Sequence, residues 1–365
     1  MKFIAITEPG LEDIAVLDVK ERCSVVAKKG VEFVSFESEW EEALRLCYRG
    51  QSIRRVLLFL HEWTVSDEIL PKTTKPILDS LKPFIKGLSF KVEVDREGEH
   101  LFQSADVAEE IGALIHDELK AKVSLESPEL LVHCFVCDKK AILGIDIVGF
   151  EMSKRSYKVF NHPNTLRGTI AYGALRIAGM TKKTTVLDPH CRSGEIPIEA
   201  ALFAYDFPVW YYDKEKFSFS RLSFVPKKDV EAVFNEKDKP GTAVIYAFDP
   251  LFAAVTATKK NSKIAGITKH LICSKYDIEW LDTKLDKNSI DLLITRPVEA
   301  TKRTPAKDAE KFMKELKYQI DFIVKPKGAV FLIKHQKPSK PVASIHQGQE
   351  CLFLESFDAS ATSSK

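Results

Sequence analysis

One short stretch in the middle of the chain constrains its fold more than any other. Thr184–Leu187 has the apolar character of a buried strand, the turn Asp188–Gly194 follows it, and an apolar helix is predicted from Glu195 to about Ala204. Further strands are predicted at Ala243–Phe248, His270–Ser274 and Asp291–Thr295, with helical segments between them. This alternation predicts a doubly wound, Rossmann-like parallel sheet, in which ligands bind beyond the carboxyl ends of the strands.

The residues before this sheet form two smaller α/β units. The first begins with a strand at Lys2–Thr7 and a helix that ends near Arg22. The second has a strand of period 2 after Leu88 and a helix with Ser104 as its N-cap. We therefore predict an α/β protein with an N-terminal domain over residues 1–75, a second domain over 76–157, the Rossmann-like domain over 158–345 and a C-terminal tail over 346–365 with a disordered end.

Charge and composition narrow the class of protein only in part. The chain has 54 Lys and Arg against 52 Asp and Glu, and this net charge of +2 neither requires nor excludes a nucleic-acid partner. Residues 298–340 hold eleven Lys and Arg against five acids, a local net charge of +6. Glu8, Glu12 and Asp13 lie where a signal peptide needs apolar residues, and no apolar run approaches the ~18 residues of a membrane span. A cytoplasmic protein without a membrane partner is therefore expected.

The cysteines and histidines do not predict a metal centre. The seven cysteines are odd in number and scattered, which favours free thiols in a reducing compartment. Cys134 and Cys137 form a Cys-x-x-Cys pair on a predicted strand, where alternation would place the two sulfurs on opposite faces. No second pair completes a zinc site, and His133 and His190 have no second ligand at metal spacing, so no metal is expected.

Two sets of motifs resemble a known family. The run Asp188-Pro-His-Cys-Arg-Ser-Gly194, followed by Ile198-Glu-Ala200, resembles motif I of the S-adenosylmethionine-dependent methyltransferases that modify guanine N2 in tRNA. The segment Phe90–Tyr157, with Arg96-x-Gly-x-His-x-Phe102, resembles the THUMP RNA-binding domain that precedes the catalytic domain in that family. The resemblance implies a ferredoxin-like unit over residues 1–75, a THUMP domain over 76–157, S-adenosylmethionine as cofactor and tRNA as partner; a partner protein subunit stays open.

The resemblance also implies which residues would hold the methyl donor. They are Asp188, Ser193 and Gly194 of motif I, Asp249 at the end of the second strand, and Asp277 near the donor's adenine. Three positions depart from the family pattern. Arg192 replaces a glycine of motif I, Glu195 replaces a threonine, and Ala247 replaces the aspartate that holds the ribose hydroxyls. These changes make binding of the cofactor doubtful.

The catalytic tetrapeptide departs from the family as well. The family has Asp or Asn, Pro, Pro, and Tyr or Phe, where the first side chain and the proline carbonyl accept hydrogen bonds from the target amine and the ring stacks on the extruded base. Here the residues are Thr295, Arg296, Pro297 and Val298. Thr295 is a weaker acceptor, Arg296 adds a positive charge, and Val298 has no aromatic face. We therefore expect methyl transfer to be impaired or lost; an active guanine-N2 methyltransferase is the alternative.

The predicted RNA-binding side shows no comparable loss. The candidate phosphate contacts are Lys154, Arg155, Lys158, Lys302 and Arg303. Seven aromatic residues between Tyr205 and Phe219 could stack on bases, but packing of an insertion against the sheet is the preferred interpretation. A nicotinamide-dependent oxidoreductase would need Gly-x-Gly-x-x-Gly in the turn, which the sequence lacks.

Overall fold

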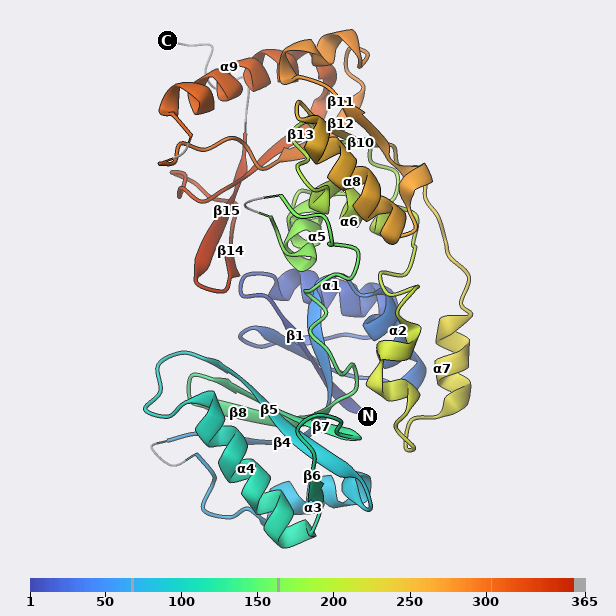
Figure 1. The fold of residues 1–365 in the computed structure, drawn as a ribbon, viewed down its shortest axis with the longest axis vertical. Coiled ribbons are helices and arrows are strands. Elements are labelled where there is room, and N and C mark those ends of the chain that lie inside the picture. Colours follow the sequence, from blue (N-terminus) through green and yellow to red (C-terminus); the bar gives the residue numbers. More distant parts are fainter. Residues whose placement is uncertain (67–68, 163–164, 303, 358–365) are drawn as a thin grey trace.

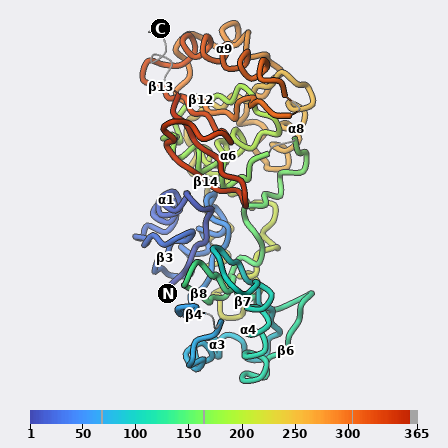
Figure 2. Tube along the Cα trace, turned by 90° about the vertical axis from the view of Figure 1, so that its left-hand side faces the viewer, coloured from blue at the N-terminus to red at the C-terminus, as the bar shows by residue number. Residues whose placement is uncertain are grey.

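A computed structural model of the chain describes residues 1–66, 69–162, 165–302 and 304–357. Two sheets follow one another along the long axis of the molecule, each with its own helices (Figure 1). The perpendicular view shows the same separation, with the blue and cyan N-terminal half below the orange and red C-terminal half (Figure 2). We call these halves the N-terminal module and the C-terminal domain.

The two small units expected at the N-terminus share one sheet. Its strands are β1 (Lys2–Thr7), β2 (Lys28–Lys29), β3 (Phe33–Glu37), β4 (Ile53–Thr64), β5 (Ser89–Glu97), β6 (Lys122–Val123), β7 (Leu130–Cys137) and β8 (Lys140–Asp146), in the order β2-β3-β1-β4-β8-β7-β5-β6. The long strand β4 joins the units, because it pairs with β1 on one side and β8 on the other. The helices are α1 (Glu12–Cys23), α2 (Trp40–Arg49), α3 (Lys75–Ile85) and α4 (Ser104–Leu119). Gln103, not Ser104, caps α4, and its side chain forms a capping box with Asp106.

The C-terminal domain is the predicted doubly wound sheet. Its strands are β9 (Val186–Asp188), β10 (Ile245–Asp249), β11 (Ile272–Lys275), β12 (Ile290–Thr295), β13 (Val324–Lys334), β14 (Ala343–Gln347) and β15 (Glu350–Ser356). Their order is β11-β10-β9-β12-β13-β15-β14, with the first five parallel. The helices are α5 (Gly168–Ile177), α6 (Glu195–Ala204), α7 (Lys227–Phe234), α8 (Phe252–Ile264) and α9 (Ala306–Ile323). Val186 packs with α5 and α6 whereas Leu187 packs with α9, so both faces are covered and the predicted fold class is confirmed.

The prediction of a C-terminal tail from residue 346 is wrong up to Ser356. β14 and β15 form a hairpin, and β15 pairs antiparallel with β13. Leu352 and Leu354 are at most 1% exposed, because strand alternation turns them toward the core. The hairpin is therefore an integral edge of the sheet. The expected disorder falls on residues 358–365, which lie outside the described residues.

The aromatic insertion after α6 packs against the N-terminal module. Trp210, Phe217 and Phe219 are at most 1% exposed and belong to the core of that module. The backbone N–H groups of Ser218 and Phe219 donate to the carbonyls of residues 148 and 147. The packing interpretation is therefore confirmed for these three rings, whereas Tyr211 and Tyr212 are exposed.

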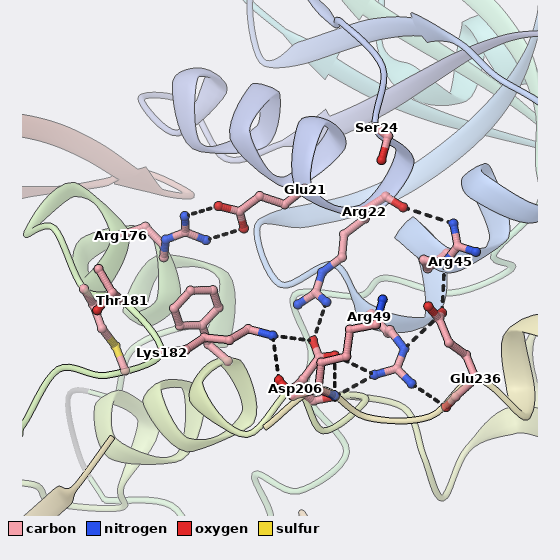
Figure 3. A pocket seen from close by; sticks show the side chains of 13 residues that line it. Glu21, Arg22, Ser24, Arg45, Arg49, Arg176, Thr181, Lys182, Asp206 and Glu236 are labelled. Carbon is pink, nitrogen blue, oxygen red and sulfur yellow. Dashed lines mark hydrogen bonds and ion pairs between the residues drawn. The ribbon is translucent and has the colours of Figure 1, made fainter. Parts of the chain in front are cut away.

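Buried ion pairs also connect the two halves. Around a cavity of about 640 Å³, Arg49 from α2 donates to the carbonyl oxygens of Asp206 and Glu236, at 2.6 and 2.9 Å (Figure 3). Arg22 from α1 donates to the Asp206 carboxylate at 2.6 Å. Arg49 also lies 3.6 Å from the Asp206 carboxylate and is only 3% exposed, so removing that carboxylate would leave a buried charge at a cost of about 3–5 kcal/mol. These contacts fix the position of the module on the C-terminal domain.

Candidate active site

The turn between β9 and α6 adopts the backbone that glycine favours. Gly194 has a φ of +89°, and Arg192 also has a positive φ, +53°. A non-glycine residue in this region costs about 1–2 kcal/mol. Two hydrogen bonds hold it there: the Arg192 N–H donates to Asp249 Oδ2 at 2.9 Å, and the Thr258 hydroxyl donates to the Arg192 carbonyl at 3.0 Å. The turn therefore keeps its shape despite the arginine.

Asp188 and Thr295 meet where the order of the strands reverses. They end the neighbouring parallel strands β9 and β12, and Thr295 Oγ1 donates to Asp188 Oδ1 at 2.7 Å. Both side chains are at most 2% exposed. Burial raises the pKa of Asp188 to about 7, although donation from Thr295 and from the His190 N–H partly opposes this. The Thr295 hydroxyl therefore gives its proton to Asp188 and keeps its oxygen lone pairs as the acceptor predicted for the target amine.

The side chain of Arg192 crosses from the turn to the tetrapeptide. Its guanidinium donates to the carbonyl oxygens of Arg296 and Pro297, each at 3.2 Å. Arg296 is itself 4% exposed and contacts the ring of His335. Burial lowers the pKa of Arg192; the pKa of Arg296 falls to about 10, first because of burial and then because of the charge on Arg192. Two cationic side chains therefore share this end of the sheet.

The residues predicted to hold the donor gather at the turn, but their polar atoms bond within the protein. Asp249 accepts from the N–H groups of Arg192 and Leu251, both at 2.9 Å, through separate oxygens. The Ser193 hydroxyl donates to Glu195 at 2.8 Å, and the Glu195 carboxylate is 4% exposed with a pKa raised by burial. Asp277, by contrast, is exposed after β11. Asp188, Ser193, Gly194 and Asp249 are thus brought together. Asp277 is exposed at the same edge, one residue after Tyr276, whose backbone N–H donates to the Asp249 carbonyl at 3.1 Å.

The predicted RNA contacts divide into exposed and buried side chains. Lys154 and Lys302 are exposed, and Arg303 lies outside the described residues. Arg155 is 4% exposed and donates to the Glu199 carboxylate at 2.8 Å, so it cannot reach a phosphate. Lys158 donates to the Leu166 carbonyl at 2.6 Å. The prediction for Arg155 is therefore wrong, because its guanidinium pairs with the buried carboxylate of Glu199 in α6, a long-range contact that no local pattern shows.

Sequence reasoning missed His335 as a residue of the site. It follows β13, the strand beside β12, so the sheet places it at the same edge as the tetrapeptide. No strand was predicted at Val324–Lys334, so no sequence signal placed His335 at this edge. Within the described ranges, His, Cys, Asp and Glu side chains form no group of three or more suited to a metal ion. The described helices also include none with the length and apolar character needed to cross a bilayer.

Two curated relatives from archaea are similar in sequence. The tRNA (guanine(6)-N2)-methyltransferase of Archaeoglobus fulgidus is 35% identical over 219 residues, which cover 57% of this chain and 55% of that protein. The protein of the same name from Methanocaldococcus jannaschii is 26% identical over 313 residues, covering 81% of each. The chain thus spans about half of one relative and four fifths of the other.

Solved structures share the fold along nearly the whole chain. A possible methylase from Clostridium difficile 630 has a TM-score of 0.80 at 18% identity and covers 98% of this chain and 97% of its own. The protein SMU.472, crystallised as a complex with SAH, has a TM-score of 0.77 at 16% identity, covering 98% of this chain and 97% of its own. Residues 68–146 match the THUMP domain, and residues 155–344, which are over half of the chain, match the family described as RMKL-like, methyltransferase domain. The chain therefore belongs to the RMKL-like methyltransferase-domain family and carries a THUMP domain before its Rossmann-like domain.

Proposed function

We propose that this chain is a tRNA-binding member of the THUMP methyltransferase family in which methyl transfer is impaired or lost. One observation carries the proposal. The Arg192 guanidinium donates hydrogen bonds to the carbonyl oxygens of Arg296 and Pro297. Both belong to the tetrapeptide, in which a backbone carbonyl would accept a hydrogen bond from the target amine. An amine held by these acceptors would compete with a fixed, charged donor for the same lone pairs.

S-adenosylmethionine is the cofactor that the family implies. The turn, as it lies in this structure, leaves little room for it. The cavity directly over the turn, between Asp188, Cys191, Glu195 and Arg296, has a volume of about 10 Å³. That is close to the minimum for one water molecule, whereas pockets for ligands of this size have roughly 300–1,000 Å³. Asp249 already accepts one backbone N–H group on each oxygen, so ribose hydroxyls would have to share its remaining lone pairs with these bonds.

Binding of tRNA is supported by the THUMP match and by the two relatives named as tRNA methyltransferases. Lys154 and Lys302 supply exposed charge for phosphates. We expect the protein to recognise the shape of the tRNA and its sugar–phosphate backbone, so binding would not depend on the base sequence.

The first experiment measures transfer of a labelled methyl group from S-adenosylmethionine to unmodified tRNA. The wild-type chain should transfer far less than the Archaeoglobus fulgidus relative, which is the positive control, or none above background. Transfer at a rate comparable to that of the relative, or micromolar binding of the donor in calorimetry, would favour the alternative of an active tRNA guanine-N2 methyltransferase. The names of the relatives are the observation in favour of that alternative.

The second experiment measures retention of unmodified tRNA on the full chain at rising salt. The variant with both Lys154→Gln and Lys302→Gln should bind more weakly and show a salt slope smaller by about 2, since each phosphate contact contributes about 1. Arg221→Gln removes an exposed charge elsewhere on the surface and is the matched control. Weak binding that is equal in wild type and double variant would sink the tRNA proposal.

A further inference from the structure

A groove of about 390 Å³ lies between α8 and the edge strand β11 of the C-terminal sheet, and we call it the α8 groove. α8 runs along the outside of the C-terminal domain (Figures 1 and 2). The floor of the groove is apolar, with Val255 from α8 and with Leu271 and Cys273 from the β11 segment. Its described lining includes none of the residues predicted to hold the methyl donor. The α8 groove is therefore separate from the candidate active site.

Three lysines of α8 form the rim of this groove, namely Lys259, Lys260 and Lys263. All three are exposed, and within the described part of the chain none has a carboxylate partner; Lys260 lies over the ring of Phe160, 4.5 Å from its centroid. Residues 250–276 hold five lysines and no Asp or Glu. The helix dipole favours a cation such as Lys263 in the last turn of α8, but Lys259 and Lys260 lie one turn earlier. The segment therefore presents unneutralised positive charge to the solvent.

The charge pattern of α8 differs from that of α9, the other helix rich in lysine. The lysines of α9 alternate with acids: Lys307, Asp308, Glu310, Lys311, Lys314, Glu315, Lys317 and Asp321. Mixed charge of this kind is typical of a solvated helix face. Like charges four positions apart, as Lys259 and Lys263 are, destabilise a helix. The pattern of α8 therefore favours a surface that meets a polyanion.

Exposed aromatic rings accompany these lysines. Phe252 begins α8, lines the groove and is 72% exposed. Phe160 is held against α8, because its N–H donates to Asn261 Oδ1 at 3.0 Å and its carbonyl accepts from Asn261 Nδ2 at 2.9 Å. A basic groove with exposed rings is the arrangement that binds single-stranded nucleic acids, whose bases are free to stack. The rings and the THUMP domain of the same chain favour RNA over an acidic peptide as the polyanion.

We propose that the α8 groove binds an unpaired segment of RNA, with phosphates against its three lysines and a base stacked on Phe252. The volume of the groove lies within the roughly 300–1,000 Å³ of small-molecule pockets, so it admits a base. Lysine is a point charge on a flexible stem, so these contacts follow the backbone without selecting a sequence. The inference rests on the proposed binding of tRNA, and it assigns unpaired nucleotides to a surface of the C-terminal domain.

The first measurement is the affinity of the full chain for a labelled oligouridine of about twelve nucleotides, at rising salt. The variant with Lys259→Gln, Lys260→Gln and Lys263→Gln should bind about ten-fold more weakly, with a salt slope smaller by about 2, since each phosphate contact of a single strand contributes about 0.7. The matched control changes three exposed lysines on and after α7 to glutamine, Lys227, Lys228 and Lys237. It removes the same charge and should bind like the wild type.

The second measurement tests the ring. Phe252→Ala should weaken binding of oligouridine by about five-fold or more, because it removes the stacking surface for one base, whereas Phe252→Trp should retain the affinity. Tyr318→Ala removes a ring that is 65% exposed on α9 and is the control. A duplex RNA of the same length should bind equally to wild type and Phe252→Ala, because its bases are stacked within the helix.

The third measurement uses a thiol in the groove itself. Hydrogen bonding with Cys191 and the charge on Lys259 lower the pKa of Cys273, although burial opposes them. Since the thiolate is the reactive form, iodoacetamide should modify Cys273, and saturating oligouridine should slow this reaction several-fold. Cys351 in β15 is also half-buried and is the internal control, because its rate should not change when RNA is added.

Several results would overturn the inference. They are wild-type affinity for oligouridine in the triple lysine variant of α8, wild-type affinity in Phe252→Ala, or protection of Cys273 by polyglutamate equal to that by oligouridine, which would assign the groove to an acidic peptide. Circular dichroism checks that each variant folds. Retention of tRNA by the wild type together with any of these results would refute this inference alone. Failure of the wild type to retain tRNA would refute the proposed function.

Discussion

Arg155 and Arg296 are both buried arginines, but they lie in opposite electrostatic surroundings. Arg155 joins the N-terminal module to α6: it donates to Glu199 at 2.8 and 3.2 Å and to the Gln51 carbonyl at 2.6 Å. Burial alone would lower its pKa, yet Glu199 raises the pKa overall. Arg296 lies beside another arginine, and its pKa is lowered to about 10.

The comparison separates a cation that is paired with a buried carboxylate from a cation that lies beside a second one. A paired guanidinium such as Arg155 stabilises the contact between two halves and has no charge left for a ligand. The two guanidiniums over the C-terminal sheet lie at the edge where ligands bind in this fold. Burial by itself therefore does not tell the two roles apart; the balance of nearby charge does.

The largest effect on stability is expected when the buried ion pair between Arg155 and Glu199 is broken. Arg155→Met leaves the Glu199 carboxylate, which is 0% exposed, without its cation, and should lower the free energy of unfolding by about 3–5 kcal/mol. Urea denaturation of the full chain measures this. Lys29→Met removes one partner of the exposed pair with Asp13 and should cost less than about 1 kcal/mol. Similar losses in the two variants would mean that the buried pair does not hold the halves together.

The next effect depends on pH and concerns Asp188. Its pKa is about 7 in the folded chain and 3.8 ordinarily, so the folded state binds more protons and stability falls as pH rises between these values. Asp188→Asn keeps the acceptor for Thr295 and removes the charge. The stability of Asp188→Asn relative to wild type should therefore increase by about 2 kcal/mol between pH 5 and pH 7, rise by a further ~0.4 kcal/mol up to pH 8 and stay constant above.

Denaturation at pH 5, 7 and 8 tests this expectation. The matched control is Asp277→Asn, which changes an exposed carboxylate at the end of another strand of the same sheet. It should alter stability little at any of these pH values. A difference between Asp188→Asn and wild type that does not change with pH would contradict a buried, protonated Asp188.

The fold could be predicted well from the sequence where a local pattern was sufficient. Alternating apolar strands and helices predicted the doubly wound sheet, and the motif I residues predicted the turn at its carboxyl edge. The hairpin of β14 and β15 was missed because its short alternating run, with Leu352 and Leu354 inward, follows a stretch rich in Lys and Pro. The shared N-terminal sheet was missed because β4 pairs with strands from both units, and pairing over such distances leaves no local signal.

The candidate site could be predicted only in part for the same reason. The sequence pointed to Arg192 and to the tetrapeptide, but not to the contact between them, which joins residues 104 and 105 positions apart. It also could not distinguish Lys154 from Arg155. These neighbours differ in exposure because one faces solvent and the other faces Glu199, a residue of α6.

The smallest effect is expected for Lys158, a lysine bonded inside the fold, and it is compared with that of the exposed Lys154. Lys158 donates to the Leu166 carbonyl at 2.6 Å and lies 3.8 Å from Glu195 Oε1, with a side chain only 18% exposed. Lys158→Met should therefore lower the free energy of unfolding by about 1 kcal/mol, because a buried acceptor loses its donor. Its tRNA affinity should stay within about two-fold of wild type, whereas the exposed Lys154→Gln should weaken binding more, with a salt slope reduced by about 1. If Lys158→Met weakens tRNA binding as much as Lys154→Gln and leaves stability unchanged, then Lys158 faces the RNA and the division between paired and ligand-facing cations fails at this residue.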